Sequence, residues 1–86
     1  GLGDGLIGSA LACGGRLDQR RPVVAHRTLP CGTHLQICVG ARCVIAVVRD
    51  RGPFVHGRVL DLGPRVARAL RFVDVGVGRV RYRVRG

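Results

Sequence analysis

The chain has 86 residues, enough for one small domain, and it contains neither lysine nor glutamate, so its charge of +10 reflects 15 arginines against five aspartates. The hydrophobic fraction of 47% comes mostly from valine, leucine, alanine and isoleucine, and β-branched residues favour strands over helices. Such a charge attracts anionic lipids or acidic wall polymers, although a GC-rich coding sequence would produce the same arginine bias. Nucleic acid is not the expected partner, because the chain has few rings for base stacking, namely Phe54, Phe72 and Tyr82.

Short apolar runs separated by turn residues predict a succession of strands. The first covers residues 22–26 and ends before a Pro-Cys-Gly turn. Residues 34–38 and 43–48 form the next two strands, joined as a hairpin, and the second ends at an Asp-Arg-Gly-Pro loop. A short strand follows at residues 57–60. These strands predict an all-β or β-rich fold.

One helix and one further strand complete the predicted elements. Residues 64–70 begin with a proline, which suits the first turn of a helix, and continue with apolar residues three and four positions apart. Residues 79–85 alternate arginine with apolar or aromatic residues without exception. Because side chains alternate across a strand, this pattern places Val80, Tyr82 and Val84 inward and four arginines outward.

Four cysteines in so short a chain predict a disulfide framework formed in an oxidising compartment. Three pairings are formally available. The hairpin with its turn at Gly40 would bring Cys38 opposite Cys43, which leaves Cys13 for Cys31. The alternative is a zinc site, but its usual Cys-x-x-Cys knuckles are absent. We therefore expect two disulfides and neither a metal nor a cofactor.

The chain shows no linker, no low-complexity tract and no change in composition that would mark a second domain. It also has no run of about 18 apolar residues that could cross a membrane, and it does not open on a charged and then apolar leader. We expect one soluble domain over residues 1–86, whose export signal was removed or lies outside the segment.

Residues 24–33 (VAHRTLPCGT), 48–54 (VRDRGPF) and 57–62 (GRVLDL) resemble, in order and in spacing, the rare lipoprotein A (RlpA-like) double-psi β-barrel family. The resemblance covers essentially all of residues 1–86 and extends more distantly to the first domain of expansins and to barwin. It implies an all-β fold, a six-stranded double-psi β-barrel with one or two short helices. It also implies a secreted or cell-envelope domain that acts on peptidoglycan as a lytic transglycosylase, cleaving the linkage from MurNAc to GlcNAc.

The resemblance assigns the catalytic positions to Asp50 and His26. An aspartate can protonate the leaving oxygen and then accept the proton of the attacking hydroxyl. Arg49 and Arg51 would lower the pKa of Asp50, whereas a general acid needs it raised, but alternation along the strand should direct both arginines away. His26 would lie near Asp50 as a hydrogen-bond partner or a sugar-binding group, or would instead orient the turn at residues 28–33.

Three further residues match positions that would bind substrate, namely Thr33, Arg58 and Asp61. Asp61 also precedes a Gly-Pro pair, where it would cap the predicted helix, and we prefer that interpretation. His34 and His56 are expected on the surface. The chain departs from the family at Gly15, because relatives generally carry a glutamate there that contributes to the site. This departure weakens the expectation of catalysis.

Two other functions remain open. The same groove would serve a non-catalytic module that docks a larger carrier protein or a virion component on glycan, in the cell envelope or on a phage particle. The arginine-rich surface and the missing glutamate favour that alternative. A secreted barrel that binds or inhibits another protein is the third.

Overall fold

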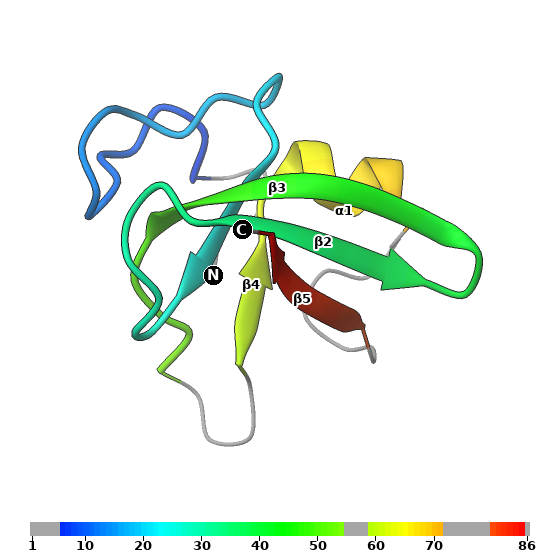
Figure 1. Ribbon diagram of the computed structural model, residues 1–86. Coiled ribbons are helices and arrows are strands. Elements are labelled where there is room, and N and C mark those ends of the chain that lie inside the picture. The colour runs from blue at the N-terminus through cyan, green and yellow to red at the C-terminus, as the bar shows by residue number, and fades with distance from the viewer. Residues whose placement is uncertain (1–5, 55–58, 72–79, 86) are drawn as a thin grey trace.

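The computed structural model describes residues 6–54, 59–71 and 80–85, which form five strands and one helix (Figure 1). One sheet contains all five strands in the order β4-β1-β3-β2-β5. The elements are β1 (Val23–His26), β2 (His34–Val39), β3 (Arg42–Asp50), β4 (Leu60–Leu62), α1 (Pro64–Ala69) and β5 (Arg81–Arg85). The β-rich class is confirmed, and the described residues supply five of the six strands expected. No helix in this part of the chain is long and apolar enough to cross a membrane.

The hairpin of β2 and β3 is the longest paired segment, and its two strands run side by side along a strong curve in Figure 1. Its turn lies at Gly40, where φ is +57°, a left-handed value that glycine adopts without steric cost. The register places Cys38 opposite Cys43, and the two form a disulfide. The second disulfide joins Cys13 to Cys31, so both pairings are as predicted.

The sheet curls until its distant strands meet. In a flat sheet, β1 and β5 would be three strand spacings apart, about 14 Å. The rings of His26 on β1 and Tyr82 on β5 nevertheless lie 6.1 Å apart between centroids. The concave side of the curled sheet and α1 enclose the main core, which contains Val24, Leu35, Ile37, Ala46, Val48, Leu62, Val66, Ala67 and Leu70.

β1 is buried on both of its faces, which explains why its run of four residues contains no exposed position. Val24 belongs to the main core, whereas Val23 and Ala25 point to the opposite face. There they pack with Leu11 and Leu17 of the segment that precedes β1. This segment therefore forms a cover over the outer side of the sheet, beside the end of β3 (Figure 1).

The helix begins at Pro64 as predicted and ends one residue before the predicted end, but its start is organised differently. The N-cap is Gly63, with no side-chain cap, so the interpretation of Asp61 as the cap is wrong. Gly63 approaches the backbone of β1 so closely that a Cβ atom would lie 2.6 Å from the oxygen of Val23. Asp61 instead lies within β4, because pairing with β1 extends that strand to Leu62. The predicted strand also included Gly57 and Arg58, which lie outside the described residues.

The inward placement of the last strand is only partly correct. Val80 packs against the main core, but Tyr82 is 38% exposed and Val84 is 52% exposed. Among the described residues β5 pairs with β2 alone, so it forms an edge of the sheet and one side of it meets no neighbouring strand. Alternation in the sequence defines the two faces of a strand, but it does not define whether both are covered.

Candidate functional site

Asp50 ends β3 at an irregularity in the pairing with β1. Val48 lies opposite Val24, but the next residue of β1, Ala25, lies opposite Asp50, so Arg49 is skipped in the register. Such a bulge redirects side chains at a strand end. The half-buried Asp50 carboxylate accepts a hydrogen bond of 2.8 Å through Oδ1 from the backbone N–H of Ala12. The carboxylate is thus held by the N-terminal segment.

The two arginines beside Asp50 have other partners, although the bulge at Arg49 interrupts the strand alternation from which this was predicted. Arg49 donates to the carbonyl oxygens of Cys13 and Gly14, at 3.2 and 3.0 Å. Arg51 donates to the carbonyl oxygens of His26 and Leu29, at 3.0 and 2.6 Å. Neither guanidinium forms an ion pair with Asp50 within the described part of the chain.

The Cys13–Cys31 disulfide joins the two segments that these arginines hold. Cys13 follows Ala12, the donor to Asp50, and its backbone N–H donates to the carbonyl oxygen of Arg49 at 3.1 Å. Cys31 lies on the other segment, where its Sγ accepts a contact of 3.4 Å from Arg51. The disulfide therefore crosslinks the segment that binds Asp50 to the segment that binds Arg51.

His26 is buried, with 8% of its surface exposed, and its Nδ1 accepts hydrogen bonds from the backbone N–H groups of Thr28 and Leu29, at 3.1 and 3.0 Å. Backbone N–H groups only donate, so Nδ1 carries no proton and the neutral ring has its hydrogen on Nε2. Burial lowers the pKa of His26, and the positive charges of Arg51 and Arg27 lower it further. His26 is therefore a neutral hydrogen-bond donor through Nε2. Its Nδ1 also orients the turn after β1, which is the second of the two roles predicted for it from the sequence.

Tyr82 was not predicted as a site residue, yet its ring is the one that contacts His26. The Tyr82 hydroxyl lies 3.5 Å from Nε2 of His26, with the rings edge to face at 69°. The signal in the sequence was a single tyrosine in a strand of arginines and valines, since tyrosine offers an apolar body with a polar tip. Asp50 and His26 lie at neighbouring strand ends, but their described hydrogen bonds lead to different segments.

The pH dependence of stability should reveal the buried, neutral His26. Its pKa is lowered in the folded state, so the unfolded chain binds a proton more readily. The resulting contribution to stability is complete above the unfolded pKa of about 6.5 and is lost as pH falls through this value toward the folded pKa. We expect the thermal midpoint to fall with pH below about 6.5 in wild type, and less steeply in His26→Gln.

His34→Gln is the matched control, because His34 is an exposed histidine. It should retain the wild-type dependence on pH, as measured by circular dichroism melts across about pH 5 to 8. If His26→Gln and His34→Gln melt with the same slope as wild type, His26 is not the group responsible.

The predicted substrate-binding residues have different positions. The hydroxyl of Thr33 donates to the carbonyl oxygen of Pro30 at 2.6 Å and so closes the turn before β2. Asp61 is 4% exposed and lies opposite Ala25, which in turn lies opposite Asp50. The two aspartates therefore flank β1, about 10 Å apart at the backbone. Arg58 lies outside the described residues, as does His56.

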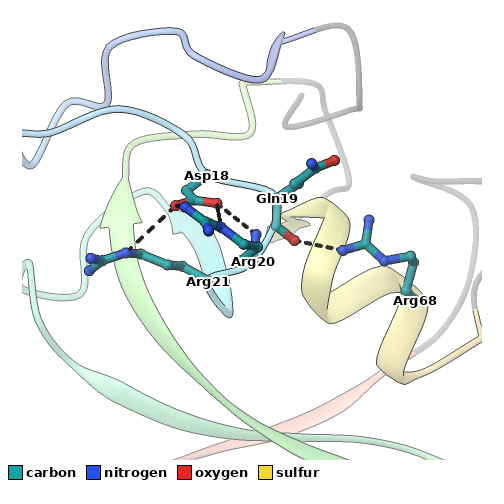
Figure 2. A network of polar contacts seen from close by, with 5 residues as sticks. All are labelled: Asp18, Gln19, Arg20, Arg21 and Arg68. Atoms are coloured by element: carbon teal, nitrogen blue, oxygen red, sulfur yellow. Dashed lines mark hydrogen bonds and ion pairs between the residues drawn. The ribbon is translucent and has the colours of Figure 1, made fainter.

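An open cleft of about 690 Å³ lies on the outer side of the sheet, next to the segment that binds Asp50. Its charged lining residues are Arg16, Arg21, Arg49 and Asp18. Asp18 accepts hydrogen bonds from the backbone and side chain of Arg20, which lower its pKa, and lies 4.0 Å from Arg21 (Figure 2). Among the described lining residues, Asp18 is the one acidic side chain and it is already paired with arginine, so this part of the cleft is basic.

Gly14 and Gly15 line the same cleft. Gly15 is the position where the family resemblance leads us to expect a glutamate. A Cβ atom there would meet nothing within 4 Å, but φ is +78°, which side chains rarely tolerate. The local backbone is therefore suited to glycine, and no carboxylate enters the cleft from this position.

Comparison with known proteins places this geometry in a family. A family model described as lytic transglycolase matches residues 4–82. The chain belongs to the RlpA-like double-psi β-barrel family. RlpA-like relatives include a probable endolytic peptidoglycan transglycosylase from Nostoc sp., 41% identical over 88 residues, which cover all of this chain and 24% of the relative.

Two other RlpA-like proteins bear related names. A probable endolytic peptidoglycan transglycosylase from Synechocystis sp. is 41% identical over 80 residues, covering 91% of this chain and 25% of its own length. An endolytic peptidoglycan transglycosylase from Rickettsia prowazekii is 37% identical over 83 residues, covering 94% of this chain and 26% of its own length. The chain thus spans about a quarter of the length of these RlpA-like relatives. Its two disulfides indicate an extracytoplasmic location, as expected for the family.

Proposed function

We propose that this domain cleaves the glycan strands of peptidoglycan as a lytic transglycosylase, with Asp50 as its acid and base. The observation that carries the proposal is the state of the Asp50 carboxylate. Oδ1 is held by the backbone N–H of Ala12, while neither adjacent arginine is paired with it. A carboxylate oriented in this way, and not neutralised by a guanidinium, can exchange a proton with a substrate. The names of the relatives support the same reaction.

The proposed reaction needs one group to move a proton. Protonated Asp50 gives its proton to the glycosidic oxygen as the bond from the anomeric carbon of MurNAc to that oxygen breaks. The primary hydroxyl of the same sugar then attacks the anomeric carbon, and the Asp50 carboxylate takes the hydroxyl proton. The products are an anhydro-MurNAc end and a free GlcNAc hydroxyl. Water is not consumed, and Asp50 ends protonated as it began.

His26 is proposed to bind a sugar oxygen rather than to transfer a proton. Its Nε2–H is the donor, and the contact with Tyr82, at 3.5 Å, is long enough for a substrate oxygen to replace it. We propose that Thr33, Arg58 and Asp61 contribute to substrate binding.

A second function is favoured by one observation. The cleft near Asp50 receives no side chain from Gly15, where active relatives are expected to supply a glutamate. The same surface would then hold glycan strands without cutting them. That such a module belongs to a larger carrier protein or to a phage particle stays a prediction from the sequence.

One experiment separates the two functions. Purified protein is incubated with glycan strands stripped of their stem peptides, and the new ends are analysed by mass spectrometry, in parallel with cosedimentation on the same strands. Anhydro-MurNAc ends that increase with time support the lytic reaction. Cosedimentation without new ends supports the binding module, and the absence of both would contradict engagement of glycan.

A further inference from the structure

The last strand carries a row of arginines on its outer face, Arg81, Arg83 and Arg85, which we call the arginine ladder. Arg83 donates through Nε to Oε1 of Gln36 at 2.7 Å. Gln36 lies on β2 between Leu35 and Ile37, both fully buried, so its side chain points away from the core. Since residues two apart share a face of a strand, the whole ladder points to the outside.

The charge of the arginine ladder is not neutralised within the part of the molecule that the structure describes. Arg83 contacts the neutral side chain of Gln36, and Arg81 donates to the carbonyl oxygen of Gly40 at 2.7 Å. No ion pair joins Arg81, Arg83 or Arg85 to a described carboxylate. All three residues are exposed, and most of their N–H groups remain available to a ligand.

The arginine ladder continues into the basic cleft across the outer face of the sheet. Arg85 lies opposite His34 on β2, His34 lies opposite Val47 on β3, and Val47 lies opposite Val23 on β1. Val23 and Val47 both line the cleft that contains Arg16, Arg21 and Arg49. One surface therefore runs from the outer face of β5 to the cleft, with arginines at both of its ends.

Protection of an edge strand is the simpler explanation of the arginine ladder. Charged side chains at an edge prevent the strand from pairing with another molecule. That role requires charge on β5 alone, and it gives no reason for the second group of arginines in the cleft across the sheet. A ligand that follows the surface accounts for both groups.

We propose that this surface binds an extended phosphodiester polymer of the cell wall, such as a poly(glycerol phosphate) chain. Successive side chains of the ladder leave the strand about 7 Å apart, which suits a linear polymer with regularly repeated phosphates. Arginine binds phosphate through paired N–H groups with defined geometry. The two disulfides indicate an oxidising compartment, where a wall polymer is accessible and nucleic acid is not the usual ligand. Binding here does not depend on cleavage by Asp50, so either proposal can fail alone.

The test measures the affinity of the full chain for fluorescently labelled poly(glycerol phosphate) at several salt concentrations. We expect Arg83→Gln/Arg85→Gln to weaken binding about 10- to 30-fold at low salt, and to reduce the slope of log affinity against log salt by roughly 1.5. The matched control is Arg65→Gln/Arg71→Gln, which removes the same charge from exposed positions on and just after α1. It should weaken binding less than about threefold.

Two results would overturn the proposal. An equal loss of affinity in both double variants would mean that net charge alone attracts the polymer. Tighter binding of single-stranded DNA, or of vesicles rich in anionic lipid, would assign the surface to a different partner. Should the glutamine variant fail to fold, Arg83→Lys/Arg85→Lys keeps the charge, and a loss of affinity smaller than tenfold but measurable is expected because lysine lacks the paired N–H groups.

Discussion

Replacement of Asp50 by asparagine should abolish the formation of anhydro-MurNAc ends while leaving the domain folded and bound to glycan. Asparagine keeps the size of the side chain and an oxygen that can accept the hydrogen bond from Ala12, which now holds Oδ1 at 2.8 Å. It cannot protonate a leaving oxygen. Loss of general acid and base catalysis costs about 10²- to 10⁴-fold in rate, which mass spectrometry of the glycan ends can measure.

Asp18→Asn is the matched control for this experiment. Asp18 lies at the rim of the basic cleft, where its partners are Arg20 and Arg21 (Figure 2). It lines the cleft but transfers no proton in the proposed reaction, and arginines already occupy its carboxylate, so the variant should cleave at close to the wild-type rate. Equal activity in wild type, Asp50→Asn and Asp18→Asn would remove Asp50 from the mechanism.

The two disulfides should contribute unequally to activity. In the loop-entropy model, the crosslink from Cys13 to Cys31, with a separation of 18 residues, stabilises the fold by about 3 kcal/mol. The crosslink within the hairpin, with a separation of 5, stabilises it by about 2 kcal/mol. Replacing both cysteines of the longer loop by serine should lower the melting temperature by roughly 12 to 24 °C.

The two disulfide variants should differ in cleavage activity even where both are fully folded. The crosslink from Cys13 to Cys31 joins the segment that orients Asp50 to the segment bound by Arg51, whereas the hairpin crosslink lies at the far end of β2 and β3. At a temperature where both variants are folded, Cys13→Ser/Cys31→Ser should lose most of its cleavage activity and Cys38→Ser/Cys43→Ser should retain it. Equal activities would show that the longer crosslink only stabilises the fold.

The sequence predicts the local elements well because their causes are local. Turn residues and a pair of cysteines define the hairpin of β2 and β3, and a proline followed by spaced apolar residues defines α1. β4 ends at Leu62, two residues beyond its predicted end, since its bounds depend on pairing with β1 and not on its own composition. The exposure of Val84 likewise depends on whether another strand covers β5.

The site depends on contacts between residues far apart in the chain, which no local pattern reveals. The hydrogen bond from Ala12 to Asp50 spans 38 positions, and the contact between His26 and Tyr82 spans 56. The family resemblance identifies Asp50 and His26 as candidates, but only the curl of the sheet brings Tyr82 to His26. That Arg49 and Arg51 have partners other than Asp50 was predicted, but the reason differs: backbone carbonyl oxygens bind both guanidinium groups, and a bulge at Arg49 interrupts the strand alternation.

The most direct test of the account is the source of the oxygen at the new glycan ends. Peptide-free glycan strands are incubated with the wild-type domain in water enriched in a heavy oxygen isotope, and each new end is weighed by mass spectrometry. An intramolecular reaction through Asp50 predicts anhydro-MurNAc ends that contain no heavy oxygen and that disappear in Asp50→Asn. Reducing ends carrying heavy oxygen, or anhydro ends that persist in Asp50→Asn, would contradict it.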